Sequence, residues 1–202
     1  MKSSAQDHEG AVEPQARSGH AHKYPAQPPG SALDERVGSK KPNGSGKDQS
    51  AAKDSSRSKE AGRKELAERL NEDLTREYQA IIAYVVYSQT LKGAAYMAIA
   101  KELEIHAAEE LAHAITIAKH IDYLGGTPAV TPKTVKVIDD AAGMLRADLD
   151  NETQTIRAYR ERLKQCEALE EFGIAEDLRE ILREEQEHQM DLATALGEDV
   201  PH

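Results

Sequence analysis

Apolar residues recur at the spacing of an α-helix along most of the chain beyond residue 60. Leu66, Leu70 and Leu74 share one helix face, and Leu145 and Leu149 repeat that pattern later. Proline-free stretches separated by glycines predict four helices, at about residues 60–91, 94–124, 138–166 and 170–196. We expect the core between these helices to contain Leu66, Leu70, Leu74, Ile81, Leu103, Ile117, Leu145, Leu149, Ile156, Leu178, Ile181 and Leu192.

The second and third predicted helices are joined by the sequence GGTPAVTPKTVKV, residues 125–137. This connection is too long for a tight turn between antiparallel helices, so we expect it to run the length of a bundle. Glycine is typical of a helix end, and Gly197 is expected to end the fourth helix. The pattern predicts an all-α four-helix bundle with one long crossover between helices two and three.

The two halves of this predicted bundle repeat one another, with Leu70 aligned on Leu145 and Tyr84 on Tyr159. The segments LNEDLTREYQAIIAY (70–84) and LRADLDNETQTIRAY (145–159) are identical at eight of fifteen positions. The same alignment pairs the motif EELAH (109–113) with EEQEH (184–188). The bundle is therefore expected to consist of two helical hairpins related by a pseudo-twofold axis.

Each half carries one Glu on its first helix and a Glu-x-x-His motif on its second. These residues are Glu77, Glu110 and His113 in the first half, and Glu152, Glu185 and His188 in the second. Residues three apart are neighbours on a helix face, so each motif directs its Glu and His to one place. Burying four carboxylates at the centre of a bundle requires compensating charge, which two divalent cations would supply. Oxygen-rich ligation with one His per metal suits iron or manganese.

A plain structural explanation has to be weighed against this metal site. Glu is abundant in the chain, and a lone histidine is more often a core or surface side chain than a ligand. Two Glu-x-x-His motifs in register, each with its own additional Glu, are much harder to obtain by chance. A purely structural bundle would also leave six inward polar groups without a purpose. We therefore predict a two-metal site.

Residues 60–197 resemble a bacterioferritin-type member of the ferritin-like superfamily. The resemblance is carried by the segments LNEDLTREYQAIIAY, EELAHAITIAKHIDYLGG, MLRADLDNE and ILREEQEHQMDL. It implies that Glu77 and His113 bind one iron, Glu152 and His188 the other, and that Glu110 and Glu185 bridge the two. It also implies a ferroxidase, which oxidises Fe(II) with dioxygen or peroxide and serves iron storage or detoxification in an oligomeric shell.

The sequence departs from the bacterioferritin pattern at two places. Leu111 stands where those proteins have a methionine that ligates haem between two subunits, so no haem is expected there. Only five residues, EDVPH (198–202), follow Gly197, where the family has a short fifth helix that helps to form a 24-subunit shell. We therefore expect a short C-terminal tail and a homo-oligomer, which could be a 24-mer, a 12-mer or a smaller assembly.

Further residues are candidates for supporting roles around the predicted metals. Asp73 and Asp148 lie four residues before a predicted ligand and are expected to accept the second N–H of a ligand histidine. Tyr84 and Tyr159 lie seven residues after one, and each is expected to hydrogen-bond a ligand carboxylate. Tyr84 is also a candidate electron donor; a surface Asp and a core Tyr are the plain alternatives. Weaker candidates, as likely to be solvated as to conduct iron, are Glu102, His106, Glu109 and Glu184.

The chain before residue 60 has a different composition. Residues 1–59 are rich in Pro, Ser, Gly and Lys and are expected to form a disordered tail. The stretch Arg36–Lys59 carries seven basic and two acidic residues, whereas the chain from Ala61 carries 16 basic and 28 acidic ones. Such a tail could contact DNA or an encapsulating shell, as in a DNA-protecting or compartment-cargo protein, or merely aid solubility.

Bulk properties narrow the functional classes further. The net charge of −10 argues against nucleic acid as a partner of the whole molecule and favours cations. The longest apolar run, Ala80–Tyr87, is too short to span a bilayer, and the N-terminus has no secretory signal, so we expect a cytoplasmic protein. Cys166 is the only cysteine, which excludes a rubredoxin domain. A di-metal peroxidase or catalase on the same scaffold is the alternative enzyme.

Overall fold

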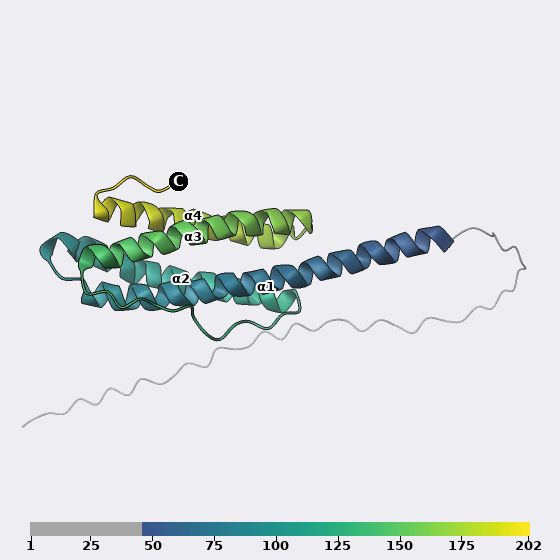
Figure 1. The fold of residues 1–202 in the computed structure, drawn as a ribbon, viewed down its shortest axis with the longest axis horizontal. Helices are drawn as coiled ribbons and strands as arrows, with labels where there is room; N and C mark the ends of the chain where they lie inside the picture. Colours follow the sequence, from purple (N-terminus) through teal and green to yellow (C-terminus); the bar gives the residue numbers. More distant parts are fainter. Residues whose placement is uncertain (1–45) are drawn as a thin grey trace, which may run out of the picture. The chain divides into compact units, whose positions relative to one another are not determined.

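The computed structural model describes residues 46–202, which form a bundle of four α-helices (Figure 1). They are α1 (Gly46–Thr90), α2 (Met97–Tyr123), α3 (Ala141–Ala168) and α4 (Phe172–Leu196), with a short 3-10 helix, η1 (Ala94–Tyr96), before α2. This part of the chain contains no strand, and none of its helices is long and apolar enough to cross a membrane. The prediction of an all-α four-helix bundle is confirmed.

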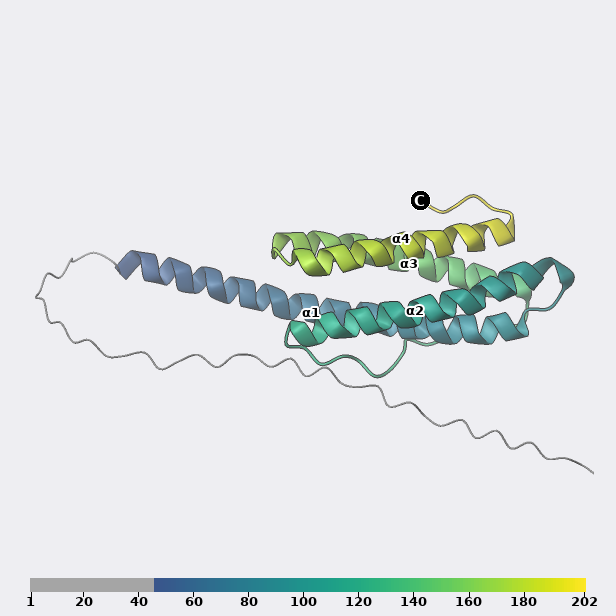
Figure 2. The same cartoon turned by 180° about the vertical axis from the view of Figure 1, so that it is seen from behind.

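The four helices are paired as the internal repeat predicted. Helix α1 packs against α2, and α3 packs against α4, so each half of the repeat forms one hairpin. The hairpins meet through contacts of α1 with α3 and of α2 with α4. Figure 2 shows the same two pairs from behind. Equivalent helices of the two halves therefore face each other.

Helix α1 begins earlier than the sequence pattern suggested. The first helix was expected at about 60–91, but α1 starts at Gly46. The segment AAKDSSRSKE (51–60) contains neither Pro nor Gly, and its Ala, Lys and Glu residues favour a helix. Residues 46–59 of the expected tail thus continue α1. Residues 1–45 of that tail lie outside the described part of the chain.

The connection between α2 and α3 runs along α1, as a crossover should. The side chain of Asn71 donates to the carbonyl of Thr127 at 3.0 Å, near the start of the connection. The hydroxyl of Tyr87 donates to the carbonyl of Lys136 at 2.6 Å, near its end. Because these two contacts lie more than four helical turns apart on α1, the connection follows the bundle axis. The predicted crossover is confirmed.

Short local signals fix the ends of the helices in the second hairpin. The side chain of Asp140 caps α3 by accepting a hydrogen bond from the backbone N–H of Gly143 at 2.7 Å. Gly197 follows α4 in a left-handed conformation with φ 70°, which glycine adopts without steric cost. Gly197 therefore ends the last helix as predicted.

The apolar core is divided into two clusters by a polar layer. Along α1, one cluster contains Leu66, Leu70 and Leu74, and the other contains Ala83, Tyr84 and Tyr87. Glu77 lies between the two clusters and is buried. All the predicted core residues are buried except Ile81, which is half-buried. The polar layer is therefore enclosed by apolar packing on both sides.

Candidate metal centre

The six predicted ligands meet in this polar layer, and every helix contributes at least one of them. They are Glu77 from α1, Glu110 and His113 from α2, Glu152 from α3, and Glu185 and His188 from α4. We call them the six central side chains; each is at most 2% exposed. Their ligand atoms form two groups, each within 4.8 Å, and the groups share Glu110 and Glu185.

The two shared residues, the inner carboxylates Glu110 and Glu185, lie between the histidines. Glu110 places Oε2 3.2 Å from Nδ1 of His113 and Oε1 3.1 Å from Nδ1 of His188. Glu185 is arranged in the same way, with Oε1 3.3 Å from Nδ1 of His113 and Oε2 3.7 Å from Nδ1 of His188. Each inner carboxylate thus turns one oxygen toward each histidine, which is the geometry of a bridge between two cations.

The two outer carboxylates, Glu77 and Glu152, are each held by a tyrosine from the opposite hairpin. The hydroxyl of Tyr159 donates to Oε1 of Glu77, and the hydroxyl of Tyr84 donates to Oε1 of Glu152. The other oxygen of Glu77, Oε2, lies 3.4 Å from Nδ1 of His113. The prediction that both tyrosines hydrogen-bond a central carboxylate is confirmed. The pseudo-twofold axis relates the two hydrogen bonds to each other.

The outward-facing nitrogens of the histidines contact Glu184 and Glu109. Nε2 of His113 is 2.8 Å from Oε2 of Glu184, and Nε2 of His188 is 3.0 Å from Oε2 of Glu109. A carboxylate in this position fixes the ring and leaves Nδ1 free to face the centre. Sequence reasoning gave this role to Asp73 and Asp148, which was wrong. The sequence feature that could have identified these partners is that Glu109 and Glu184 occupy equivalent positions in the repeat, one residue before each inner carboxylate.

Asp73 and Asp148 have other surroundings. Asp73 accepts a hydrogen bond from Nε of Arg162 at 2.7 Å. Burial raises the pKa of Asp73 to about 6, although Arg162 opposes the shift. Asp148 has a buried Oδ2 without a hydrogen-bond partner in residues 46–202, and burial raises its pKa well above the usual value. Asp73 therefore links α1 to α3 through an ion pair and does not touch a histidine of the centre.

The charges of the centre are distributed unevenly. Burial raises the pKa of both outer carboxylates, and the negative inner carboxylates raise it further. Burial alone would raise the pKa of the inner carboxylates as well, but the nearby rings of His113 and His188 outweigh it and hold both pKa values below their usual range. Conversely, burial would lower the pKa of His188, yet the nearness of its ring to the inner carboxylates raises this pKa to about 10. The histidines and the inner carboxylates thus favour each other's charged form.

Several polar atoms of the centre are left without partners. In the described chain, buried atoms lacking a hydrogen bond include Oε2 of Glu77, Oε1 of Glu110, both carboxylate oxygens of Glu185 and Nδ1 of His188. Buried acceptors of this kind are costly unless something else satisfies them. Two divalent cations would satisfy these atoms. The residues present therefore fit a two-metal site.

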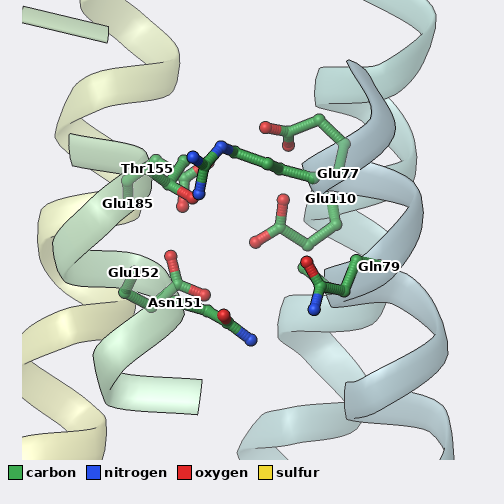
Figure 3. A pocket seen from close by; sticks show the side chains of 9 residues that line it. Glu77, Gln79, Glu110, Asn151, Glu152, Thr155 and Glu185 are labelled. Carbon is green, nitrogen blue, oxygen red and sulfur yellow. The ribbon is translucent and has the colours of Figure 1, made fainter. Parts of the chain in front are cut away.

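A pocket reaches the centre from the face between α1 and α3 (Figure 3). The four central carboxylates lie on its wall and are labelled in the figure. The remaining wall is mostly polar and consists of Arg76, Gln79, Ala80, Asn151 and Thr155. The pocket thus brings a mostly polar wall up to the central carboxylates.

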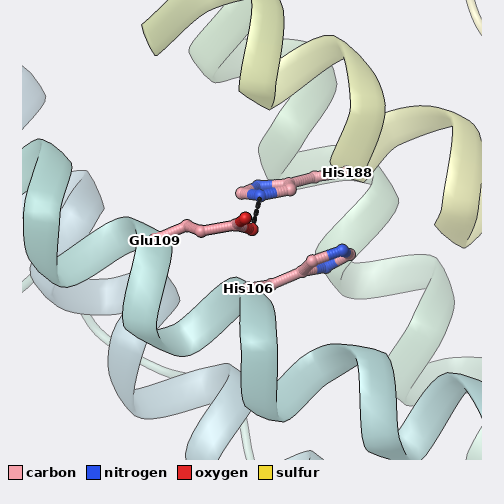
Figure 4. Close-up of side chains that lie close together, drawn as sticks. All are labelled: His106, Glu109 and His188. Atoms are coloured by element: carbon pink, nitrogen blue, oxygen red, sulfur yellow. Dashed lines mark hydrogen bonds and ion pairs between the residues drawn. The ribbon is translucent and has the colours of Figure 1, made fainter.

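His106 extends the centre on one side only. Its ring stacks on His188 with 4.0 Å between the ring centroids (Figure 4). It also meets the ring of Tyr84 edge-on. Burial, and secondly the charge of His188, lowers the pKa of His106 to about 4. Glu102 is half-buried one turn earlier on α2. Leu111, by contrast, is 51% exposed on the outer surface of α2, and the lack of haem there stays a prediction.

Comparisons with known proteins agree with this architecture. Residues 67–199 match the ferritin-like domain family. A bacterioferritin of Desulfovibrio desulfuricans is 32% identical over 126 residues, which cover 61% of this chain and 70% of that protein. A ferritin-like, diiron-carboxylate protein from Bacillus anthracis aligns with a TM-score of 0.65 and 34% identity, over 67% of this chain and 97% of the other.

A dodecameric thioferritin, the bacterioferritin-related protein from Bacteroides fragilis, aligns with a TM-score of 0.62 and 29% identity. That alignment covers 67% of this chain and 86% of the thioferritin. The family match spans the four-helix bundle from the middle of α1 to the end of α4 and contains all six central side chains. The chain therefore belongs to the ferritin-like family and is of the bacterioferritin type.

Proposed function

We propose that the six central side chains bind two iron ions and that the protein is a ferroxidase. Glu77 and His113 bind one ion, Glu152 and His188 bind the other, and the inner carboxylates bridge them. The observation that carries this assignment is that each inner carboxylate faces both histidines, at 3.1 to 3.7 Å. The likeness to a diiron-carboxylate protein and to a bacterioferritin supports it.

The donor set supports iron as the metal. Four carboxylates and two imidazoles suit Fe(II) and Fe(III) and contain no thiolate that would favour softer metals. Manganese has similar ligand preferences and is the alternative occupant. Iron bound here is both substrate and product: Fe(II) enters, loses one electron and leaves as Fe(III) or stays in place.

In the proposed reaction two Fe(II) ions supply two electrons. Dioxygen takes up these electrons with two protons and becomes hydrogen peroxide; peroxide as the oxidant would give two waters. The protein holds the ions side by side through the inner carboxylates, while Tyr84 and Tyr159 orient the outer ones. Glu109 and Glu184 keep Nδ1 of each histidine directed at the centre. The pocket between α1 and α3, whose wall includes the four central carboxylates, is the proposed entrance for the cation.

Metal binding should release protons and tighten as the pH rises. The pKa of His188 is raised to about 10, so its ring is protonated at neutral pH and must lose that proton to bind a cation. Affinity should therefore increase up to about pH 10, about tenfold per pH unit for each proton released. Calorimetric titration with Zn(II) in buffers of different ionisation enthalpy measures the number of protons. An affinity that does not change with pH would contradict the assignment of His188.

Removing Glu184 should weaken one half of the centre and removing Glu109 the other. Glu184→Ala deprives His113 of its only partner at Nε2 in the described chain, and Glu109→Ala does the same to His188. Loss of such a partner typically lowers metal affinity by about 10- to 100-fold. Titration should show that each variant binds one ion per subunit with lower affinity than the wild type does. Glu187→Ala, which removes an exposed side chain from α4, is the control and should bind both ions normally.

Tyr84→Phe separates a positioning role of this tyrosine from electron donation. Both tyrosines donate to an outer carboxylate, so Tyr84→Phe and Tyr159→Phe should each slow Fe(II) oxidation by about tenfold if they only position it. A much larger loss for Tyr84→Phe alone would indicate that Tyr84 also supplies an electron. The comparison needs only single-turnover rates of the two variants.

The proposed activity is tested by mixing the full-length protein with Fe(II) under dioxygen and, separately, under anaerobic peroxide. A ferroxidase should form Fe(III) at up to two ions per subunit in the first fast phase and consume one dioxygen per two Fe(II). Rapid turnover of peroxide without Fe(II) would instead favour the peroxidase or catalase alternative. No acceleration over Fe(II) in buffer would refute the proposal.

The dodecameric relative supports a homo-oligomeric shell as the setting of this activity. A 24-mer has twice the mass of a 12-mer, and smaller assemblies have less mass than either, so light scattering distinguishes them. DNA or shell contact through the basic tail is a separate proposal, and residues 36–45 of its segment Arg36–Lys59 lie outside the described residues. A gel shift with and without residues 1–59 tests DNA binding, which should weaken steeply with salt.

A further inference from the structure

The pseudo-twofold symmetry is broken beside the metal centre. The alignment of the two halves pairs His106 with Ile181 and Asp191 with Thr116. A histidine and an aspartate thus lie next to His188, where the other half of the centre has an isoleucine and a threonine. Potential metal ligands therefore occupy these positions beside His188 but not beside His113.

Three side chains of this region gather their ligand atoms in one place. Atoms of Glu102, His106 and Asp191 lie within 4.8 Å of one another. Nε2 of His106 is 3.4 Å from Oδ2 of Asp191. The His106 side chain is 2% exposed, whereas that of Asp191 is 48% exposed. The cluster therefore connects the surface between α2 and α4 with a buried imidazole.

The imidazole of His106 is not satisfied by its protein neighbours. Its Nδ1 is buried and has no hydrogen-bond partner within residues 46–202. If Nδ1 carries the proton, the lone pair of Nε2 faces the carboxylate of Asp191, and two acceptors meet at 3.4 Å. If Nε2 carries it, Nδ1 is a buried acceptor without a donor, which is also costly. A cation between Nε2 and the carboxylates removes the first conflict.

The cluster is linked to the metal centre through Glu109. His106, Glu109 and His188 also bring ligand atoms within 4.8 Å of one another. Figure 4 shows Glu109 reaching the ring of His188, with Oε2 3.0 Å from Nε2, while His106 lies beside both. A cation near His106 would therefore be separated from the centre by a single carboxylate.

We propose that Glu102, His106 and Asp191 form a third site for a divalent cation, beside the His188 half of the centre only. Two carboxylates and one imidazole are a donor set that suits Fe(II), Mn(II) and Zn(II). The site holds a cation on its way to or from the adjacent half of the centre. Its identification as an iron site rests on the proposed function, but its ability to bind a divalent cation does not.

Mn(II) binding to the full-length protein tests this site. Equilibrium dialysis should find three ions per subunit, and electron paramagnetic resonance should show a coupled pair plus one isolated, hyperfine-split Mn(II). Asp191→Asn removes an exposed carboxylate, so the fold should be kept; it should abolish the isolated signal and weaken the third ion about 10- to 100-fold. The coupled pair should stay.

Asp177→Asn is the matched control. Asp177 is the repeat equivalent of Glu102; its side chain is 39% exposed and contacts His120, away from the three clustered residues, so this variant should keep all three ions. Two ions in the wild type, or an isolated Mn(II) that survives Asp191→Asn, would overturn the proposal. An isolated Mn(II) without the coupled pair would refute the two-metal centre and leave the third site standing. Adding Ile181→His and Thr116→Asp together should create a fourth site.

Discussion

Replacing Glu110 with alanine should slow Fe(II) oxidation by on the order of 100-fold or more. Loss of a residue that merely hydrogen-bonds a metal ligand already lowers activity by up to about 100-fold, and Glu110 is a proposed ligand itself. Glu110 faces both histidines, at 3.2 Å and 3.1 Å, so its removal affects both proposed ions at once. The variant should also leave Nδ1 of His113 and His188 with fewer acceptors. The measurement is the single-turnover rate of Fe(III) formation by stopped-flow absorbance.

The control for this variant is Glu104→Ala. Glu104 lies on the same helix but is exposed and pairs with Lys101, so its removal should leave the rate within twofold of the wild type, an effect of about 0.4 kcal/mol. Circular dichroism and light scattering should show that both variants keep their helices and assembly. A wild-type rate in correctly folded Glu110→Ala protein would show that oxidation occurs elsewhere.

Removing the metal should lower the melting temperature by about 10–20 °C. A cation that binds only the folded protein at a hundredfold excess over its Kd stabilises it by about 2.7 kcal/mol, so two sites give about 5 kcal/mol. For a chain of this size each kcal/mol shifts the melting temperature by about 2–4 °C. The unpaired oxygens of Glu77, Glu110 and Glu185 are the groups that gain partners when the cations bind.

Zn(II) is the suitable ion for this measurement because it binds without being oxidised. Scanning calorimetry should compare protein treated with a chelator, the same protein resupplied with Zn(II), and Glu110→Ala under both conditions. The wild type should recover its melting temperature on resupply, and the variant should recover only part of it. Equal melting temperatures with and without metal in the wild type would mean that the centre does not bind cations in the folded state.

The helices and the six central side chains were predictable because both depend on local periodicity. The Glu-x-x-His motif places its two side chains on one helix face whatever the partner helices do. The internal repeat, which aligns Glu110 with Glu185 and His113 with His188, then requires that the two faces be equivalent. The crossover could also be anticipated, since its length excludes a tight turn.

Contacts between hairpins could not be derived in the same way. Spacing along α1 puts Asp73 on the face of Glu77, but the register between α1 and α3 decides that it meets Arg162. Likewise, whether Glu109 is solvated or reaches His188 depends on how closely α2 and α4 approach. The start of α1 was misplaced for a different reason: composition marked residues 46–59 as tail-like, while their local helix propensity was overlooked.

The most direct test of the two-metal centre is anomalous diffraction from crystals soaked anaerobically in Fe(II). We expect two strong peaks within the centre of each subunit, one beside Nδ1 of His113 and one beside Nδ1 of His188, with both inner carboxylates in contact with both peaks. A centre whose six side chains surround no peak at saturating Fe(II) would contradict the account, whether or not a further peak lies beside Glu102, His106 and Asp191.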